Sequence, residues 1–270
     1  MDLVKAVIIG IVEGLTEWLP ISSTGHMIIL NEFLKLDVSE EFWEFFLVAI
    51  QFGAILAVIV IFWDKLWPFK IADGKLWLRK ASLNIWLKVV VATLPAAIIG
   101  LLLDDWMNEH LYNYVVVAIA LIAYGIWFLS LESSRKGDYK INKLKEIDLR
   151  TALLIGLFQV LALVPGTSRS GSTIIGGMML GTSRSVAAEF TFWMAVPVMA
   201  GASLLKLLKF GFDFSGHELA ILAVGCLSAF LVSLASIRFL MNYVKKHDFK
   251  LFGIYRIVLG LVVLIYFFLS

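Results

Sequence analysis

Two glutamates are the first residues whose spacing indicates chemistry. Glu13 and Glu17 stand four positions apart, so a helix would place both carboxylates on one face. The residues around them are almost all apolar, including Ile8, Leu15 and Trp18, which argues against a face that is solvated on all sides. Because ionisable groups are costly inside apolar segments of this kind, we expect both glutamates to be catalytic.

Hydroxyl groups and a histidine follow the glutamates. Ser and Thr are preferred N-caps, and a helix that begins here would point free N–H groups and a partial positive charge at an anion. His26 lies about one turn after Ser23 and is placed to act on it as a base or an acid. The alternative for His26 is a hydrogen bond to a neighbouring helix. We therefore predict that Ser23 and His26 are catalytic and that three neighbours bind substrate: Ser22, Thr24 and Gly25.

An arginine stands among hydroxyl groups in a second polar stretch, residues 165–173. Burying a guanidinium costs about 2.5 kcal/mol or more unless it is paired. Its planar fork suits a phosphate group, so we expect Arg169 to be a catalytic ligand of an anion. The alternative is a structural ion pair with Glu13 or Glu17. The neighbours expected to bind substrate are Gly166, Thr167, Ser168, Ser170 and Thr173.

The sequence Gly-Thr-Ser-Arg-Ser occurs twice, at residues 166–170 and 181–185. The second copy is expected where the chain returns to the membrane surface, so that Arg184 can extend into lipid headgroups at little cost. We interpret Arg169 as a ligand and Arg184 as a membrane anchor.

The composition predicts the elements that position these residues. Of the 270 residues, 60% are hydrophobic and 16% are charged, against about 25% charged residues in soluble domains, and the mean hydropathy is +0.90. Continuous apolar runs predict an all-α polytopic membrane protein rather than a β-barrel. Six segments are predicted to be transmembrane helices: 44–63, 86–103, 112–131, 189–208, 219–240 and 252–269.

The charges of the linkers predict an orientation. The linkers at 64–88 and 132–150 each carry six Lys or Arg residues, whereas the linker at 104–114 carries none and that at 209–218 carries one. By the positive-inside rule the basic linkers are cytoplasmic. The N- and C-termini are then both extracytoplasmic.

Two further segments, 3–36 and 151–186, are each interrupted near the middle by a proline and several hydroxyl residues. The linker before segment 151–186 is cytoplasmic, and the span 189–208 after it must also start on the cytoplasmic side to reach the weakly charged linker at 209–218. Segment 151–186 therefore enters and leaves on one side, and the same argument applies to segment 3–36. We therefore predict two re-entrant helical hairpins in addition to the six spans.

An internal repeat relates the two halves. The chain is predicted to be a single membrane domain, residues 1–270, with repeats of approximately 1–131 and 150–270. Pro20 matches Pro165 and Ser23 matches Ser168 at an offset of 145. Each half is a hairpin followed by three spans, so the halves have inverted topology. Such repeats place the binding site at their interface, near the middle of the bilayer, where irregular backbone lines a cavity.

At these residues the sequence resembles the undecaprenyl pyrophosphate phosphatase family of bacteria, the bacitracin-resistance phosphatases. The motif from Glu13 to Glu17, which continues through residues 20–26, and the motif at 165–173 carry the resemblance. It implies hydrolysis of undecaprenyl pyrophosphate to the monophosphate and inorganic phosphate, which recycles the lipid carrier for cell-wall synthesis. It also implies a divalent cation, the bacterial inner membrane and an active site that opens to the extracytoplasmic side.

The resemblance leaves two chemical roles open. The attacking group is either Ser23, activated by His26 or Glu17, or a water molecule activated by Glu17. The glutamates either supply a base or hold Mg²⁺ or Ca²⁺, since hard cations prefer carboxylate oxygen. The metal ligands predicted on this basis are Glu13 and Glu17.

A transporter or flippase for an anionic lipid or solute is the alternative function, because inverted repeats with broken helices are a transporter architecture. The expected partners are the prenyl pyrophosphate and membrane lipid. No nucleic-acid partner is expected, and the apolar helix faces leave a homodimer open.

Overall fold

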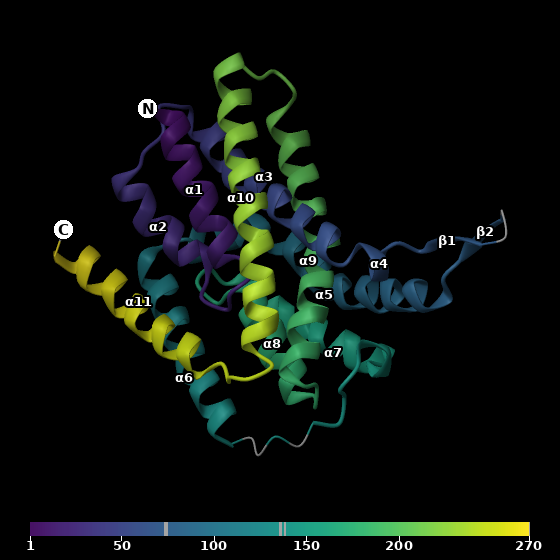
Figure 1. Cartoon of the computed structure of the whole chain (residues 1–270). Helices are drawn as coiled ribbons and strands as arrows, with labels where there is room; N and C mark the ends of the chain where they lie inside the picture. The colour runs from purple at the N-terminus through teal and green to yellow at the C-terminus, as the bar shows by residue number, and fades with distance from the viewer. Residues whose placement is uncertain (73–74, 135–136, 138, 270) are drawn as a thin grey trace.

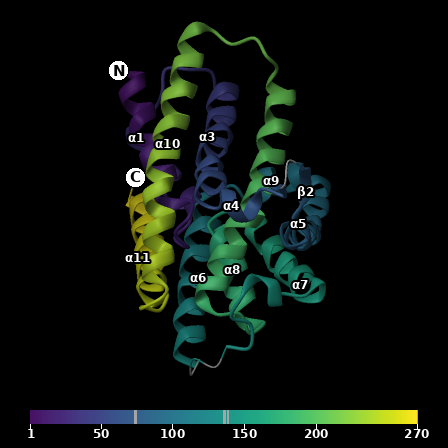
Figure 2. The same cartoon turned by 45° about the vertical axis from the view of Figure 1, so that its right-hand side comes forward.

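The fold was analysed in a computed structural model that describes residues 1–72, 75–134, 137 and 139–269. Most of these residues are helical, and the helices gather into one body in which segments from the two ends of the chain lie side by side (Figures 1 and 2). Arg135 and Lys136, which count among the six basic residues of the predicted linker at 132–150, lie outside the described residues.

Six long apolar helices form most of this body, and each is long and hydrophobic enough to cross a membrane. Five of them correspond to a predicted span to within five residues at each end, whereas α5 (Lys80–Leu111) begins six residues before the predicted span 86–103 and ends eight residues after it. The all-α polytopic membrane fold predicted from the sequence is therefore confirmed. The helices are α3 (Glu40–Ile61), α5 (Lys80–Leu111), α6 (Tyr114–Ser134), α9 (Arg184–Phe210), α10 (Gly216–Tyr243) and α11 (Lys250–Leu269).

Short elements fill two of the linkers. After α3 come the helix α4 (Trp63–Leu66) and the strands β1 (Phe69–Ala72) and β2 (Lys75–Leu78), which pair antiparallel with Phe69 opposite Leu78. A single 3-10 turn, η1 (Leu144–Glu146), precedes the second broken segment. The sequence analysis treated both regions as linkers without regular structure.

The two predicted hairpins are pairs of short helices separated by a break. In the first, α1 (Asp2–Thr16) is followed by α2 (Ser23–Phe33). In the second, α7 (Leu149–Val160) and the 3-10 turn η2 (Leu161–Leu163) are followed by α8 (Arg169–Met179). Proline disfavours a helical conformation in the residue before it, which is consistent with breaks at Pro20 and Pro165. That the pairs are re-entrant in a bilayer stays a prediction.

The helices after the breaks begin with the same unusual cap. Ser22 precedes α2 with φ 72° and Ser168 precedes α8 with φ 69°, and each hydroxyl accepts a hydrogen bond from the backbone N–H three residues on. A positive φ is rare outside glycine. The two breaks thus share an uncommon cap at Ser22 and Ser168, whereas the sequence analysis matched Ser23 with Ser168. The break after Pro165 is one residue longer than the break after Pro20.

Each pair of packed long helices has a counterpart when the corresponding helices of the two halves are interchanged. Helix α1 lies along α10 and α7 lies along α5, while α3 contacts α9 and α6 contacts α11 (Figures 1 and 2). The inverted repeat requires this pattern of packing. The repeat itself, with its boundaries, stays a prediction.

Glycine permits the closest of these approaches. A Cβ added to Gly10 would lie 2.4 Å from the carbonyl oxygen of Gly225, and one added to Gly156 would lie 2.2 Å from that of Ala92. Both distances are shorter than van der Waals contact allows, so only glycine lets α1 reach α10 and α7 reach α5. Small residues serve the same purpose at other membrane helix interfaces.

The start of α7 is a capped helix end outside the apolar segments. The carboxylate of Asp148 accepts a hydrogen bond of 2.7 Å from the backbone N–H of Thr151. This bond holds the pKa of Asp148 below its ordinary value, because it stabilises the charged form of the carboxyl group.

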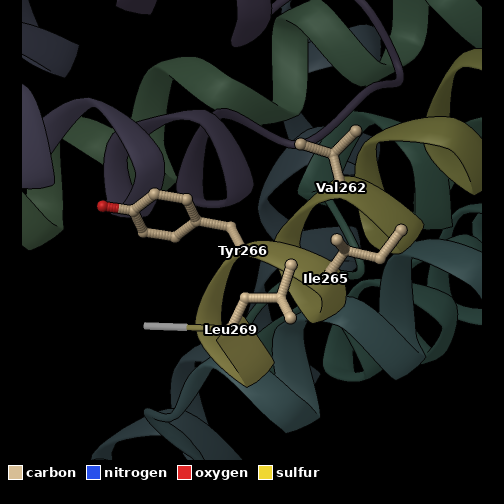
Figure 3. Close-up of a pocket in the computed structure, with 4 residues that line it drawn as sticks. All are labelled: Val262, Ile265, Tyr266 and Leu269. Carbon is tan, nitrogen blue, oxygen red and sulfur yellow. The ribbon is translucent and has the colours of Figure 1, made fainter.

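The outer faces of the long helices are apolar, as expected for surfaces that meet lipid. On α11 they include a hollow lined by Val262, Ile265, Tyr266 and Leu269, with the ring of Tyr266 turned to one side (Figure 3). This hollow lies on the outside of the body and holds no charged group.

Arg184, which was predicted to be a headgroup anchor, is paired with a buried glutamate in the structure. Its Nε donates to Glu132 at 2.8 Å and its Nη2 donates to the second carboxylate oxygen. The Glu132 side chain is completely buried and also accepts a hydrogen bond from the backbone N–H of Phe249. Because burying an unpaired carboxylate is costly, the arginine at the start of α9 is held at the end of α6.

We predict that Glu132→Gln lowers the free energy of unfolding by about 3 kcal/mol, since it leaves Arg184 and the Phe249 N–H without a charged acceptor. The matched control is Glu44→Gln, which removes the partner of Lys206 in an exposed ion pair and should cost about 1 kcal/mol or less. Equilibrium unfolding in mixed detergent micelles measures both. Equal losses for the two variants would show that the Glu132 pair is no more stabilising than a surface pair.

Candidate active site

The carboxylate of Glu17 is the point at which the two breaks meet. Its Oε2 accepts a hydrogen bond of 2.9 Å from the Ser23 hydroxyl, and its Oε1 accepts one of 3.1 Å from Nη2 of Arg169. Glu17 and Arg169 are separated by 152 residues in sequence, and their side chains are only 8% and 11% exposed. A base, a hydroxyl and a cation thus share one nearly buried site.

Helix ends position these three groups. Glu17 directly follows α1, Ser23 is the first residue of α2, and Arg169 is the first residue of α8. The N-termini of α2 and α8 therefore both begin at the site. Their free N–H groups and partial positive charges favour an anion there.

The guanidinium of Arg169 has three kinds of contact. Besides Glu17, its Nη1 donates to the carbonyl oxygen of Thr191 at 2.9 Å, and its Cζ lies 5.9 Å from the centre of the Trp18 ring. Its buried Nε has no acceptor within the described part of the chain. The sequence analysis left open a ligand role and an ion pair with Glu13 or Glu17, and the pair in the structure is with Glu17.

The hydroxyl groups of the second break mostly bind protein atoms. Ser170 donates toward the carbonyl oxygens of Glu17 and Leu19, at 3.1 and 3.3 Å, and so ties α8 to the first break. The hydroxyl of Thr173 lies 2.7 Å from that of Thr191.

The hydroxyls of Ser168 and Thr167 also bond to atoms of residues that are near in sequence. Ser168 caps α8, and its hydroxyl lies 3.1 Å from that of Ser170. The Thr167 hydroxyl lies 2.7 Å from the carbonyl oxygen of Val164, within its own turn. The roles of these residues in substrate binding stay predictions.

The remaining residues predicted to bind substrate shape the backbone. Ser22 is buried and caps α2, and Thr24 is the second residue of that helix, half-buried. A Cβ on Gly25 would touch Leu121 at 3.0 Å, so glycine lets α2 approach α6. Gly166 has φ 92°, and a Cβ there would lie 2.5 Å from the Val117 carbonyl oxygen.

Glu13 lies one turn before Glu17 and interacts electrostatically with both Glu17 and Arg169. It is 2% exposed, and its Oε1 has no hydrogen-bond partner among the described residues. A buried carboxylate oxygen without a donor is suited to a cation. No group of three or more His, Cys, Asp or Glu side chains that could hold a metal occurs in the described ranges.

Carboxylate oxygens are nevertheless the ligands that Mg²⁺ and Ca²⁺ prefer. Magnesium is commonly bound through one or two carboxylates, with phosphate oxygens and water as the other ligands. Glu13 and Glu17 would supply the protein ligands of such an ion.

The hydrogen bonds of His26 do not go to the Ser23 hydroxyl. Its Nδ1 lies 2.7 Å from the carbonyl oxygen of Ser22, and its Nε2 lies 2.7 Å from the hydroxyl of Tyr255 on α11. The group bonded to the Ser23 hydroxyl is Glu17. Of the two bases considered from the sequence, Glu17 is the one already in place.

Arg256 is a residue of the site that the sequence analysis missed. Its side chain is completely buried, and its Nη1 donates to the carbonyl oxygen of Pro20 at 3.2 Å. Its Nη2 donates to the carbonyl oxygens of Gly166 and Thr167, each at 2.9 Å. One guanidinium therefore joins both breaks from a third helix, α11. Its signal in the sequence is an arginine inside a predicted span, which is rare without a function.

Thr191 on α9 was also missed, although its carbonyl oxygen and hydroxyl contact Arg169 and Thr173. A threonine within a membrane helix carries no comparable signal, because it can bond to its own helix.

Comparisons with known proteins point to one family. Residues 6–262 match the family described as bacitracin resistance protein BacA. The chain is 57% identical over 269 residues to undecaprenyl-diphosphatase 1 of Clostridioides difficile, covering 100% of this chain and 97% of the relative. It is 55% identical over 268 residues to the undecaprenyl-diphosphatase of Acetivibrio thermocellus, covering 99% of this chain and 98% of the relative. Identity of this degree over almost the full length shows that the chain belongs to the bacitracin resistance protein BacA family.

Proposed function

We propose that this multi-pass membrane protein is an undecaprenyl-diphosphatase. It hydrolyses undecaprenyl pyrophosphate to undecaprenyl phosphate and inorganic phosphate, and so recycles the lipid carrier used in cell-wall synthesis. The observation that carries the proposal is the contact of Glu17 with both Ser23 and Arg169 in a site formed by two helix N-termini. The names of the relatives support the same activity.

The site suits the terminal phosphate of a prenyl pyrophosphate. Arg169 offers a guanidinium whose Nε has no acceptor among the described residues, and the first turns of α2 and α8 offer N–H groups. Phosphoryl transfer depends mainly on positioning and on stabilising negative charge. The prenyl tail stays in the lipid phase against apolar helix faces.

Ser23 is the nucleophile that the geometry favours. Glu17 Oε2 takes the proton from the Ser23 hydroxyl while Oγ attacks the terminal phosphorus. The bond from phosphorus to the bridging oxygen breaks, and undecaprenyl phosphate leaves. Water then attacks the phosphoserine, the proton on Glu17 returns to Oγ, and the proton lost by the water passes to Glu17 and then to solvent. In the alternative, Glu17 activates a water that attacks the diphosphate directly.

Glu13 and Glu17 would hold the divalent cation, Mg²⁺ or Ca²⁺, together with diphosphate oxygens. When bound, the cation neutralises charge on the diphosphate. Glu13 suits this role because its Oε1 is buried without a hydrogen-bond donor in the described structure.

We place the protein in the bacterial inner membrane with both termini and the opening of the site on the extracytoplasmic side. The basic linkers support this orientation. In Figure 1 the N-terminus and the turn between α9 and α10 lie at one end of the molecule, and the turn between α10 and α11 lies at the other. This separation agrees with the charges, because the turn between α10 and α11 carries Lys245 and Lys246, whereas the linker at 209–218 carries one basic residue.

Phosphate release in detergent tests the function. Purified protein supplied with Mg²⁺ or Ca²⁺ should release inorganic phosphate from undecaprenyl pyrophosphate, although there is no membrane to cross. A colorimetric phosphate assay measures the rate, and Glu17→Gln is the inactive control. Absence of phosphate release, with substrate binding retained, would favour the transporter or flippase instead.

Replacement of Ser23 separates the two chemical routes. We predict that Ser23→Ala lowers kcat on the order of a thousand-fold or more, because no oxygen is left to form the phosphoenzyme. The matched control is Ser236→Ala, which removes a hydroxyl that bonds within α10 and should keep full activity. If Ser23→Ala retains substantial turnover, the covalent route is wrong and water is the nucleophile.

Arg169→Lys tests whether the planar, forked geometry of the guanidinium is needed, because lysine keeps the positive charge but not the fork. We predict a loss of about ten- to a hundred-fold in kcat/KM, which corresponds to one or more hydrogen bonds to a charged group. Arg238→Lys is the control, since Arg238 lies on the exposed side of α10. Unchanged kcat/KM in Arg169→Lys would leave Arg169 as only a structural partner of Glu17.

A further inference from the structure

The tautomer of His26 follows from its hydrogen bonds. Nδ1 lies 2.7 Å from the carbonyl oxygen of Ser22, at the start of the same helix. A carbonyl oxygen only accepts hydrogen bonds, so Nδ1 must carry a proton. The neutral ring then has its lone pair on Nε2. Any proton that His26 takes up or gives away passes through Nε2 for as long as this bond holds.

Nε2 faces Tyr255, which comes from the far end of the chain. The Tyr255 hydroxyl lies 2.7 Å from Nε2, and the two rings are stacked with centroids 5.6 Å apart and planes 8° from parallel. Toward the neutral ring the hydroxyl donates. Because a hydroxyl also accepts, it can stay bonded after Nε2 gains a proton.

Tyr255 lies on an outer face of α11, yet its hydroxyl bonds to a side chain of another helix. Tyr255 is 43% exposed, and its neighbours on that side of α11 include Ile254 and Val258, both about half exposed. In an apolar surrounding, an imidazole nitrogen and a phenol that lack partners are each costly, so their pairing is favoured. The next residue, Arg256, is the cation that bonds to both breaks. It also interacts electrostatically with His26.

We propose that Tyr255 is a positioning residue for the phosphatase reaction. The Ser22 carbonyl sets the tautomer of His26, and the Tyr255 hydroxyl holds the ring in a fixed orientation at the start of α2, about one turn after Ser23. Tyr255 itself does not touch the substrate. The inference rests on the proposed function for its kinetic consequence, but the hydrogen bond can be tested without turnover.

Nitrogen NMR of the full-length protein tests the hydrogen bond directly. The protein is labelled with 15N-histidine, and the signals of His26 among the four histidines are assigned by their loss in His26→Asn. We expect a neutral ring with its proton on Nδ1. In Tyr255→Phe the Nε2 signal should move while Nδ1 keeps its proton.

Tyr266→Phe is the matched control for this change. Tyr266 lies on the same helix and loses the same hydroxyl, but its ring packs against Phe33 and Phe267 away from His26. The His26 signals should be unchanged in this variant. An Nε2 signal that stays in place in Tyr255→Phe, or that moves equally in both variants, would overturn the proposal.

Kinetics test whether the hydrogen bond matters for turnover. We predict that Tyr255→Phe lowers kcat for phosphate release from undecaprenyl pyrophosphate by about ten-fold, which corresponds to the loss of one hydrogen bond, and leaves KM unchanged. Tyr266→Phe should behave as the unmodified protein. In a His26→Asn background, Tyr255→Phe should have no further effect, because the group it positions is gone.

Two kinetic outcomes would contradict the inference. A raised KM with unchanged kcat would mean that Tyr255 binds the substrate itself. An equal loss of kcat with and without His26 would mean that Tyr255 acts through another group. If the unmodified protein releases no phosphate, the proposed function fails, and the NMR result still decides whether Tyr255 positions His26.

Discussion

The structure depends on the need to satisfy backbone groups at two helix breaks inside an apolar protein. Where a helix stops away from water, its last carbonyl groups and the first N–H groups of the next helix lose their regular partners. Here the protein supplies those partners from other segments. Arg256 donates to carbonyl oxygens of both breaks, and Ser170 donates to two carbonyl oxygens of the first break. The bonds that stabilise the breaks also hold them together.

The same constraint explains why the chemical groups converge. A helix that begins at a break directs its first residues and its N–H groups toward the gap, and two such helices begin at this site. Ser23 and Arg169 are first residues of this kind, and Glu17 lies at the end of the helix before the first break. Glu17 bonds to both, so the buried carboxylate and guanidinium compensate each other's charge. A diphosphate could then compete with Glu17 for the arginine.

Helix α11 connects this site to the outer surface. Arg256 and Tyr255 are consecutive, so on a helix their side chains leave in different directions, the first into the breaks and the second toward His26. The helix packs along α6, where Gly125 allows close approach to the carbonyl oxygen of Gly253 and Gly260 allows close approach to that of Ala118. The last helix is therefore part of the site as well as a membrane span.

The sequence by itself determined the membrane class, the six long helices, the position of the two breaks and the candidates Glu17, Ser23 and Arg169, because hydropathy and helix-breaking residues act locally. Only the tertiary structure decided which groups are partners. In the structure Arg169 pairs with Glu17, His26 bonds to Tyr255 rather than to Ser23, and Arg184 pairs with Glu132. The tertiary structure also brought Arg256 to both breaks, 236 residues along the chain from Pro20. These partnerships depend on how helices that are distant in sequence pack together. Neither the composition nor the spacing of the residues determines that packing.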